Sequence, residues 1–437
     1  MRADLAPTKA RYWVVVFAIT LAILSYIDRV CISQAAGPIM RDLNLTRTEM
    51  GSIFSAFAIA YALFEVPGGW MGDWMGPRKV LMRIVIWWSA FTAITGFMWN
   101  FTSLYVARFL FGAGEAGCFP NLTKAFSSWL PNDERVRAQG IMWMFARWGG
   151  AFTPPLVVLV FQYMSWRWAF VLFGGIGTIW AVLFYFWYRD NPRDHKSVNA
   201  AELAMLAGNE RLATGHGAVP WGKLLKSRTI WLLWAQYFCI TYPWYFYITW
   251  LPTFLKDRYP LLSDTERANL AILPLFFGGI GSVLCGFASA RISRWTGSTA
   301  KARRMIAVVG FFGAAVMLLI FIQMQGTGNG STADAAIYAM IFMGLTSFFN
   351  DLVMPGAWAT CMDVGGKYAG TVSGSMNMMG NLAGFVAPYL GGRIVDAGLG
   401  WSTFLYSMAA MYVLGGLCWP FIDPETPLDP EDAVSHV

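Results

Sequence analysis

Long hydrophobic runs alternate with short polar connections along almost the whole chain. A helix needs about 20 mainly apolar residues to cross a lipid bilayer. By this criterion the sequence predicts twelve membrane-spanning helices, at residues 12–33, 49–71, 79–99, 101–124, 135–160, 167–188, 228–255, 266–291, 303–324, 335–361, 368–394 and 400–421. We therefore expect an all-α membrane protein.

A polar stretch in the middle of the chain separates the first six predicted helices from the last six. We expect a bundle of six helices at 1–189, a linker at 190–227, a second bundle of six helices at 228–422, and an acidic, proline-rich, disordered tail at 423–437. Within the linker, residues 200–207 are expected to form a helix on the membrane surface. The composition agrees, because 437 residues that are 57% hydrophobic and 13% charged are too apolar for an ordinary soluble protein.

Basic residues gather in the loops on one side of the predicted membrane, and cytoplasmic loops are usually enriched in Lys and Arg. The loops in question contain Arg2, Lys9, Arg11, Arg78, Lys79, Arg83, Arg135, Arg137, Arg291, Arg294, Lys301, Arg303 and Arg304. This bias predicts an inner-membrane protein with both termini in the cytoplasm. It also accounts for the net charge of +7 without a nucleic-acid partner, and we expect a monomer in the bilayer.

Motifs of soluble catalysis are absent from the sequence. It has no Walker loop, no nucleophile elbow and no HExxH motif. The six Cys lie mostly in apolar segments and lack the spacing of a metal site. The sequence thus predicts a protein that is not an enzyme and that has neither a cofactor nor a metal.

Five ionisable residues interrupt the apolar runs: Asp28, Arg29, Arg108, Glu115 and Arg147. A charge near the bilayer centre costs at least about 2.5–3.5 kcal/mol, so such residues usually face a polar cavity. Arg108 and Glu115 are seven residues apart, which is nearly two helical turns and puts both on one face. Cations beside carboxylates inside a membrane indicate an anion pathway coupled to protons.

The two halves of the chain show faint internal similarity. Gly69 in the second predicted helix corresponds to Gly286 in the eighth, and the Gly140/Arg147 pair of the fifth corresponds to Gly370/Asn377 of the eleventh. Repeats of this kind are typical of transporters that bind substrate between two halves. The alternative is chance similarity between glycine-rich helices.

The segment Gly69–Lys79 resembles the loop signature G-x-x-x-D-x-x-G-x-R-K of the major facilitator superfamily. In physical terms it predicts a gating latch. Asp73 stands at a helix end, where it can pair with Arg78 or with a helix N-terminus of the opposite half. Gly76 permits the tight turn before the basic pair Arg78-Lys79.

Three further strings, together with Asn377, resemble the anion:cation symporter family within that superfamily: Asp28-Arg29, the segment from Arg108 to Pro120, and Trp250-Leu-Pro252. This family includes bacterial permeases for galactonate, glucarate and hexuronate. The resemblance implies that Asp28 and Glu115 bind and release protons, that Arg29 binds the substrate carboxylate, and that Arg108 tunes the nearby carboxylate. The alternative is that these charges form structural ion pairs between helices.

Two charged positions leave more than one interpretation open. The sugar-acid permeases that this chain resembles have a glutamine near Arg147. This arginine is expected to neutralise a second acidic group, a phosphate or Glu115, or else to pair structurally with a carboxylate. Asp351 is a second candidate for proton coupling, unless it is solvated near a helix end. Pro355 is expected to free the carbonyl of Asp351 and to kink the helix there.

Uncharged substrate contacts are predicted at Gln236 and Tyr237 in the seventh helix, and at Asn377 and Asn381, which share a face of the eleventh. Amides and phenols suit the hydroxyl groups of a polyol acid. The alternatives are hydrogen bonds between helices and, for the tyrosine, the aromatic belt at the membrane interface.

The sequence-based hypothesis is therefore a proton symporter that imports a hexonate, a hexuronate or an aldarate by alternating access. The alternatives are a carrier for an aromatic carboxylate or an organic phosphate, and a membrane receptor that does not transport. The expected partners are a small organic anion, protons and the lipid bilayer.

Overall fold

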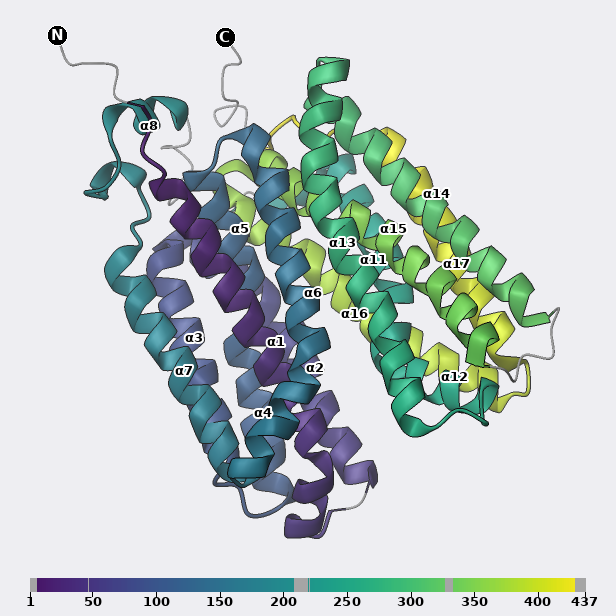
Figure 1. Cartoon of the computed structure of the whole chain (residues 1–437). Helices are drawn as coiled ribbons and strands as arrows, with labels where there is room; N and C mark the ends of the chain where they lie inside the picture. The colour runs from purple at the N-terminus through teal and green to yellow at the C-terminus, as the bar shows by residue number, and fades with distance from the viewer. Residues whose placement is uncertain (1–5, 46, 208–218, 220, 327–332, 429–437) are drawn as a thin grey trace.

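The computed structural model describes residues 6–45, 47–207, 219, 221–326 and 333–428. Parts of the predicted linker and tail, including residues 214–217, lie outside the described residues. Within the described residues the chain forms two groups of helices (Figure 1). The first group contains α1 (Ala10–Leu43), α2 (Arg47–Met75), α3 (Pro77–Thr95), α4 (Phe101–Glu115), α5 (Cys118–Trp129), α6 (Asn132–Tyr163) and α7 (Trp166–Trp187).

The second group follows the short linker helices α8 (Ala200–Met205) and α10 (Trp221–Lys226). It contains α11 (Arg228–Thr249), α12 (Leu251–Arg258), α13 (Asp264–Thr296), α14 (Thr299–Gly326), α15 (Ala333–Gly365), α16 (Ala369–Asp396) and α17 (Gly400–Cys418). With α4 and α5 counted as one span, and α11 and α12 as another, these are the twelve predicted spans. The all-α fold in two six-helix bundles is confirmed.

Length and hydropathy alone identify seven candidate membrane spans among the described residues, the last but one of which runs through both α15 and α16. The remaining spans are broken or more polar. For example, α6 contains Asp133, Glu134, Arg135, Arg137 and Arg147. Polar spans of this kind lie against other helices rather than against lipid alone.

The fourth predicted span is not one continuous helix, as the sequence pattern suggested. Helix α4 ends at Glu115, and α5 begins at Cys118. Between them Ala116 is extended and Gly117 has φ +82°, a conformation that glycine adopts without strain. The backbone N–H of Gly117 is donated to the Glu65 carboxylate of α2 at 3.1 Å. Because of the break, a backbone N–H deep in the first bundle binds a side chain of another helix.

The two bundles contact each other most extensively at two crossings, α2 with α16 and α6 with α13. A methyl group at Gly69 would collide with the backbone of Gly370, and one at Gly140 would collide with the backbone of Ser282, one turn before Gly286. Gly69, Gly140, Gly286 and Gly370 are the four glycines that correspond, in pairs, between the two halves of the sequence. Each crossing thus joins two of these glycine positions, one from each bundle, at close backbone approach.

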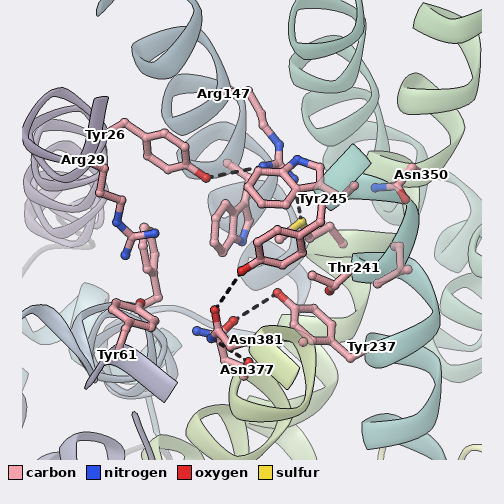
Figure 2. Close-up of a pocket in the computed structure, with 16 residues that line it drawn as sticks. Tyr26, Arg29, Tyr61, Arg147, Tyr237, Thr241, Tyr245, Asn350, Asn377 and Asn381 are labelled. Carbon is pink, nitrogen blue, oxygen red and sulfur yellow. Dashed lines mark hydrogen bonds between the residues drawn. The ribbon is translucent and has the colours of Figure 1, made fainter. Parts of the chain in front are cut away.

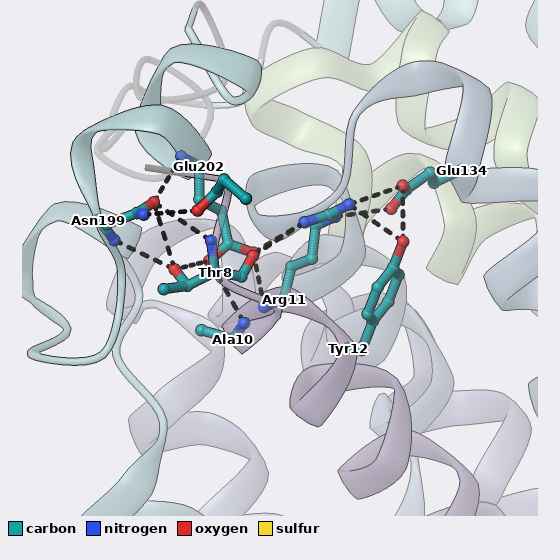
Figure 3. Close-up of polar contacts among 8 residues, drawn as sticks. Thr8, Ala10, Arg11, Tyr12, Glu134, Asn199 and Glu202 are labelled. Carbon is teal, nitrogen blue, oxygen red and sulfur yellow. Dashed lines mark hydrogen bonds and ion pairs between the residues drawn. The ribbon is translucent and has the colours of Figure 1, made fainter. Parts of the chain in front are cut away.

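The linker helix α8, which the sequence predicted at residues 200–207, docks on the first bundle at the start of α1 (Figure 3). Its Glu202 is fully buried and accepts the backbone N–H groups of Ala10 and Arg11, at 3.3 and 3.2 Å. The Arg11 guanidinium bridges Glu202 at 3.0 Å and Glu134 of α6 at 2.9 Å. Glu202 thereby caps the start of α1, where free N–H groups and the helix dipole favour an anion.

Candidate functional site

A cavity opens between the two bundles about midway along the long helices (Figure 2). The first bundle contributes two arginines among aromatic rings, and the second contributes mainly phenols and amides. The polar residues at the cavity are Tyr26, Arg29, Tyr61 and Arg147 from the first bundle, and Tyr237, Thr241, Tyr245, Asn350, Asn377 and Asn381 from the second. One wall is therefore cationic, and the facing wall carries neutral hydrogen-bonding groups.

Arg29 reaches the cavity from α1 and is only partly occupied by protein partners. Its Nε lies 2.9 Å from Oε1 of Glu115, its guanidinium lies 4.6 Å from the Tyr61 ring centroid, and its side chain is 23% exposed. Among the described residues, neither Nη2 of Arg29 nor Oε2 of Glu115 has a hydrogen-bond partner, although both atoms are buried. The Ser25 hydroxyl donates to the other Glu115 oxygen. Buried polar atoms are normally satisfied, so this pair has spare capacity for a ligand or a proton.

The guanidinium of Arg147 has more protein partners than that of Arg29. Its Nε and Nη2 donate to both oxygens of Asp351 on α15, at 2.7 and 3.0 Å, and both side chains are almost fully buried. Asn350 donates to the same carboxylate at 2.9 Å, and the guanidinium lies 4.5 Å from the Trp244 ring centroid. Of the interpretations left open, the structure places Arg147 against a carboxylate, and that carboxylate belongs to the opposite bundle.

Asp351 is fully buried, so it is not a solvated residue at a helix end. Pro355 lies within α15, as the sequence indicated, and the carbonyl of Asp351 accepts the Ser282 hydroxyl of α13 at 3.4 Å. The proline therefore frees a carbonyl that a neighbouring helix satisfies.

Asp28 and Arg108 lie behind the cavity wall and do not line it. Each is 2% exposed, and both act electrostatically on Glu115. The Arg108 guanidinium lies over the Phe111 ring at 4.1 Å, and its Nε and Nη1 have no hydrogen-bond partner among the described residues. These two residues surround Glu115 rather than the space that a ligand would occupy.

The neutral wall is a chain of amides and phenols. The Tyr237 hydroxyl donates to Oδ1 of Asn377 at 3.5 Å, and the Tyr245 hydroxyl donates to Oδ1 of Asn381 at 3.1 Å. Gln236, a predicted substrate contact, does not line the cavity. It is fully buried and accepts the indole N–H of Trp419 at 3.3 Å, because its face of α11 turns toward the helices of its own bundle.

Glu65 is a residue of the site that does not appear among the residues predicted from the sequence. It is fully buried, it accepts the Gly117 N–H, and its other oxygen accepts Nδ2 of Asn377 at 2.6 Å. It therefore connects the break between α4 and α5 to a cavity residue of the opposite bundle. The available signal was a carboxylate inside an apolar run, two residues before Pro67.

The latch residues lie where α2 ends and α3 begins, beside the start of α16. Asp73 accepts the backbone N–H groups of Gly370 and Thr371, at 3.0 and 2.6 Å, which is the predicted contact with a helix N-terminus of the opposite half. Arg78 instead donates to the Tyr185 carbonyl of α7, and Lys79 is exposed. Asp73 therefore ties the bundles together, whereas the basic pair does not.

Further ties between the bundles lie at the same end of the bundles and were not predicted. Asp363 of α15 pairs with Arg135 of α6 and, at 2.5 Å, with Arg303 of α14. Lys124 of α5 lies 3.6 Å from Asp73 and donates to the Lys367 carbonyl. The described part of the chain has no group of three His, Cys, Asp or Glu side chains that could hold a metal ion. The arrangement is thus a polar cavity closed at one end by inter-bundle contacts.

Comparisons of this chain with known proteins all find similarity to membrane transporters. The family model of the Major Facilitator Superfamily matches residues 18–388. The chain is 37% identical to a probable sulfoacetate transporter of Cupriavidus necator, over 97% of this chain and 96% of that protein. It is 31% identical to a hexuronate transporter of Bacillus subtilis, over 89% of each. The crystal structure of the transporter FucP in the outward conformation is similar in fold, with a TM-score of 0.69 and 15% identity over 95% of this chain and 100% of that one.

Proposed function

The chain belongs to the major facilitator superfamily, and we propose that it imports a small organic anion together with protons by alternating access. Membership makes it a multi-pass membrane protein that is not an enzyme. The basic loops and the shared end of α1 and α17 support an orientation with both termini in the cytoplasm of an inner-membrane protein (Figure 1).

The observation that carries this proposal is the Arg29–Glu115 pair. Nη2 of Arg29 is buried and has no partner among the described residues, and the arginine lies at the cavity. A guanidinium with free N–H donors suits the bidentate binding of a carboxylate or a sulfonate. The first acidic group of the substrate therefore binds Arg29.

The charge balance around the cavity supports proton coupling. Four buried carboxyl groups (Asp28, Glu65, Glu115 and Asp351) surround three arginines (Arg29, Arg108 and Arg147). With every carboxyl group ionised, this set is already negative, and an entering anion is repelled in a medium of low dielectric constant. Protonation of one or more carboxyl groups removes the repulsion, so anion and proton bind together.

Two classes of anion fit different parts of the site. A short dianion such as sulfoacetate or an aldarate would use both cations, with its second acidic group displacing Asp351 from Arg147. The probable sulfoacetate transporter among the relatives favours this class. A hexuronate or hexonate would place hydroxyl groups against Asn377, Asn381 and Tyr245, and the hexuronate transporter among the relatives favours that class. We propose the dianion first, because the identity of this chain to the probable sulfoacetate transporter (37%) is higher than its identity to the hexuronate transporter (31%).

Alternating access needs a second conformation in which the present ties are open. Asp73 with the N-terminus of α16, and Asp363 with Arg135, close the molecule at the proposed cytoplasmic side. The present conformation therefore corresponds to a cavity that is shut toward the cytoplasm. Import requires these contacts to break after substrate and protons have bound.

The test is uptake by the purified protein in proteoliposomes with an imposed pH gradient. Labelled sulfoacetate, D-glucarate and D-glucuronate are compared with a labelled aromatic acid and a labelled organic phosphate. We expect accumulation of at least one of the first three anions, and we expect a protonophore to abolish it. Accumulation that survives the protonophore contradicts proton coupling. Binding without accumulation identifies a receptor, and accumulation of an aromatic acid or an organic phosphate in place of these anions overturns the substrate class.

A further inference from the structure

We propose that Glu65 binds one of the transported protons, and that it does so when the substrate draws the amide of Asn377 away from it. This inference rests on the proposed function, because it concerns the coupling of substrate and proton in the same site. It assigns a proton to a carboxyl group outside the Asp28-Arg29 and Arg108–Glu115 strings.

Glu65 differs from Glu115 in the nature of its partners. Glu115 is paired with the cation Arg29 at 2.9 Å. Among the described residues the hydrogen-bond donors to Glu65 are neutral, namely the Gly117 backbone at 3.1 Å and the Asn377 amide at 2.6 Å. A buried carboxylate that depends on neutral donors becomes much less favourable as an anion when one donor leaves.

The donor that can leave is a cavity residue. Asn377 lines the cavity from α16 of the second bundle, and its Oδ1 already accepts the Tyr237 hydroxyl. A substrate hydroxyl or acidic group that binds the Asn377 amide removes a donor from Glu65. A hydrated proton (H₃O⁺) from the solution on the open side then transfers its proton to the Glu65 carboxylate, which becomes a neutral acid, and leaves water behind.

Two charged groups act on Glu65 in opposite directions, because Arg29 favours its anionic form and Glu115 disfavours it. The titratable groups that face Glu65 are Arg29 of α1, Tyr61 of α2, Glu115 of α4, Cys118 of α5 and Tyr245 of α11. Arg29 supports the anionic form of Glu65 at longer range, and substrate binding at Arg29 weakens that support. Anion entry at either end of the cavity therefore favours protonation of Glu65.

Glu65 also stands where this change can reach the bundle interface. Its second donor is Gly117 in the helix break, and Gly117 packs backbone to backbone against Gly68. One turn along α2 from Glu65, Gly69 crosses Gly370 of α16. Loss of the Glu65–Asn377 bond therefore removes a contact between α2 and α16 next to their crossing.

The first experiment measures proton uptake when ligand is added to the purified protein in weakly buffered detergent solution containing a pH-sensitive dye. Sulfoacetate and D-glucarate are the ligands, and wild type is compared with Glu65→Gln. Glutamine keeps the shape, accepts the Gly117 N–H and can donate to a turned Asn377 amide, so a purely structural role survives. We expect Glu65→Gln to take up as much as one proton fewer per bound ligand, with a correspondingly weaker dependence of affinity on pH.

The control is Glu425→Gln, which makes the same substitution at an exposed carboxylate and should behave as wild type. Equal proton uptake and equal pH dependence in Glu65→Gln and wild type would overturn the proposal and leave Glu65 as a hydrogen-bond acceptor.

A second measurement needs no ligand and does not depend on the folding of Glu65→Gln. Asn377→Ala mimics withdrawal of the amide, so the infrared carbonyl band of a protonated carboxyl group should persist to higher pH than in wild type. The double variant Glu65→Gln/Asn377→Ala, where it folds, should lose that band. An identical titration of Asn377→Ala and wild type overturns the proposal. If wild type neither binds nor accumulates sulfoacetate, D-glucarate or D-glucuronate, the proposed function fails instead, and the infrared result still decides the role of Glu65.

Discussion

The two arginine–carboxylate pairs at the cavity contain the same chemical groups but differ in how fully they are satisfied. Arg29–Glu115 lies within the first bundle and has one short contact between its charged groups. In the part of the chain that the structure describes, it leaves a buried atom without a partner on each residue. Arg147–Asp351 connects the two bundles through two parallel contacts and a supporting amide from Asn350. A buried ion pair with unused hydrogen-bond donors suits recognition of a substrate, whereas a pair whose donors are all bound by protein suits holding helices together.

The largest effect should follow from breaking the saturated pair. Asp351→Asn leaves Arg147 buried without its charge partner, and removal of one partner of a buried pair typically costs about 3–5 kcal/mol. We expect the free energy of unfolding to fall by roughly this amount, as measured by denaturation in detergent. Replacing both residues, in Arg147→Met/Asp351→Leu, should recover most of the loss, because no charge is then left unpaired. A stable Asp351→Asn protein would show that this pair does not hold the bundles.

Breaking the unsaturated pair should affect binding more than stability. Arg29→Ala removes the free donors, and we expect substrate affinity to fall by about 100-fold, or about 2.7 kcal/mol, as measured by calorimetry with the transported anion. The control is Arg83→Ala, which removes an arginine of the same bundle that contacts Met71 outside the cavity. Wild-type affinity in Arg29→Ala would eliminate Arg29 as the anion site.

The carboxylate of the unsaturated pair can be tested separately from its arginine. Glu115→Gln keeps the shape of the side chain but cannot bind and release a proton. Counterflow exchange should therefore continue. Proton-driven accumulation should be lost, so that the substrate concentration inside rises only to the concentration outside. Uptake with and without a pH gradient measures both activities. If the variant still accumulates substrate against a gradient, Glu115 is not a coupling residue and the difference between the pairs is confined to anion binding.

A smaller effect is expected at the latch, which also joins the bundles. Asp73→Asn removes the charge that faces the N-terminus of α16 and should weaken closure by about 1–2 kcal/mol, or roughly 5–30-fold. The rate of alkylation of a cysteine placed at buried Ser373, in a background without native cysteines, measures this opening. The control is Asp190→Asn, since Asp190 accepts the Arg78 N–H within the first bundle. Equal labelling of Asp73→Asn and the unsubstituted background would rule out a latch at Asp73.

Local patterns in the sequence were sufficient to predict the fold and part of the site. Apolar run lengths gave the helices, and the membership in the superfamily was confirmed. The contact of Asp73 with a helix N-terminus follows from its place at a helix end. Each of these properties depends on neighbouring residues or on a repeated spacing, which a single sequence displays directly.

Contacts between distant helices were not predictable in the same way. Helical periodicity shows which residues share a face, but it does not identify the helix that the face meets. Arg147 and its partner Asp351 are 204 residues apart, and Glu65 and Asn377 are 312 apart. For the same reason Gln236 was expected at the cavity although its face turns toward Trp419. The break after Glu115 was missed because apolar periodicity continues across it.

The backbone contacts at Gly69, Gly370 and Gly140 set a limit on how this protein can change over generations or in the laboratory. When a core side chain grows, a shrinking neighbour can often make room for it. At these crossings the atoms in the way belong to the main chain, and no substitution makes the main chain smaller. Enlargement of one of these glycines therefore has no single compensating substitution, so variants that alter the substrate should retain all three and change the residues that line the cavity instead.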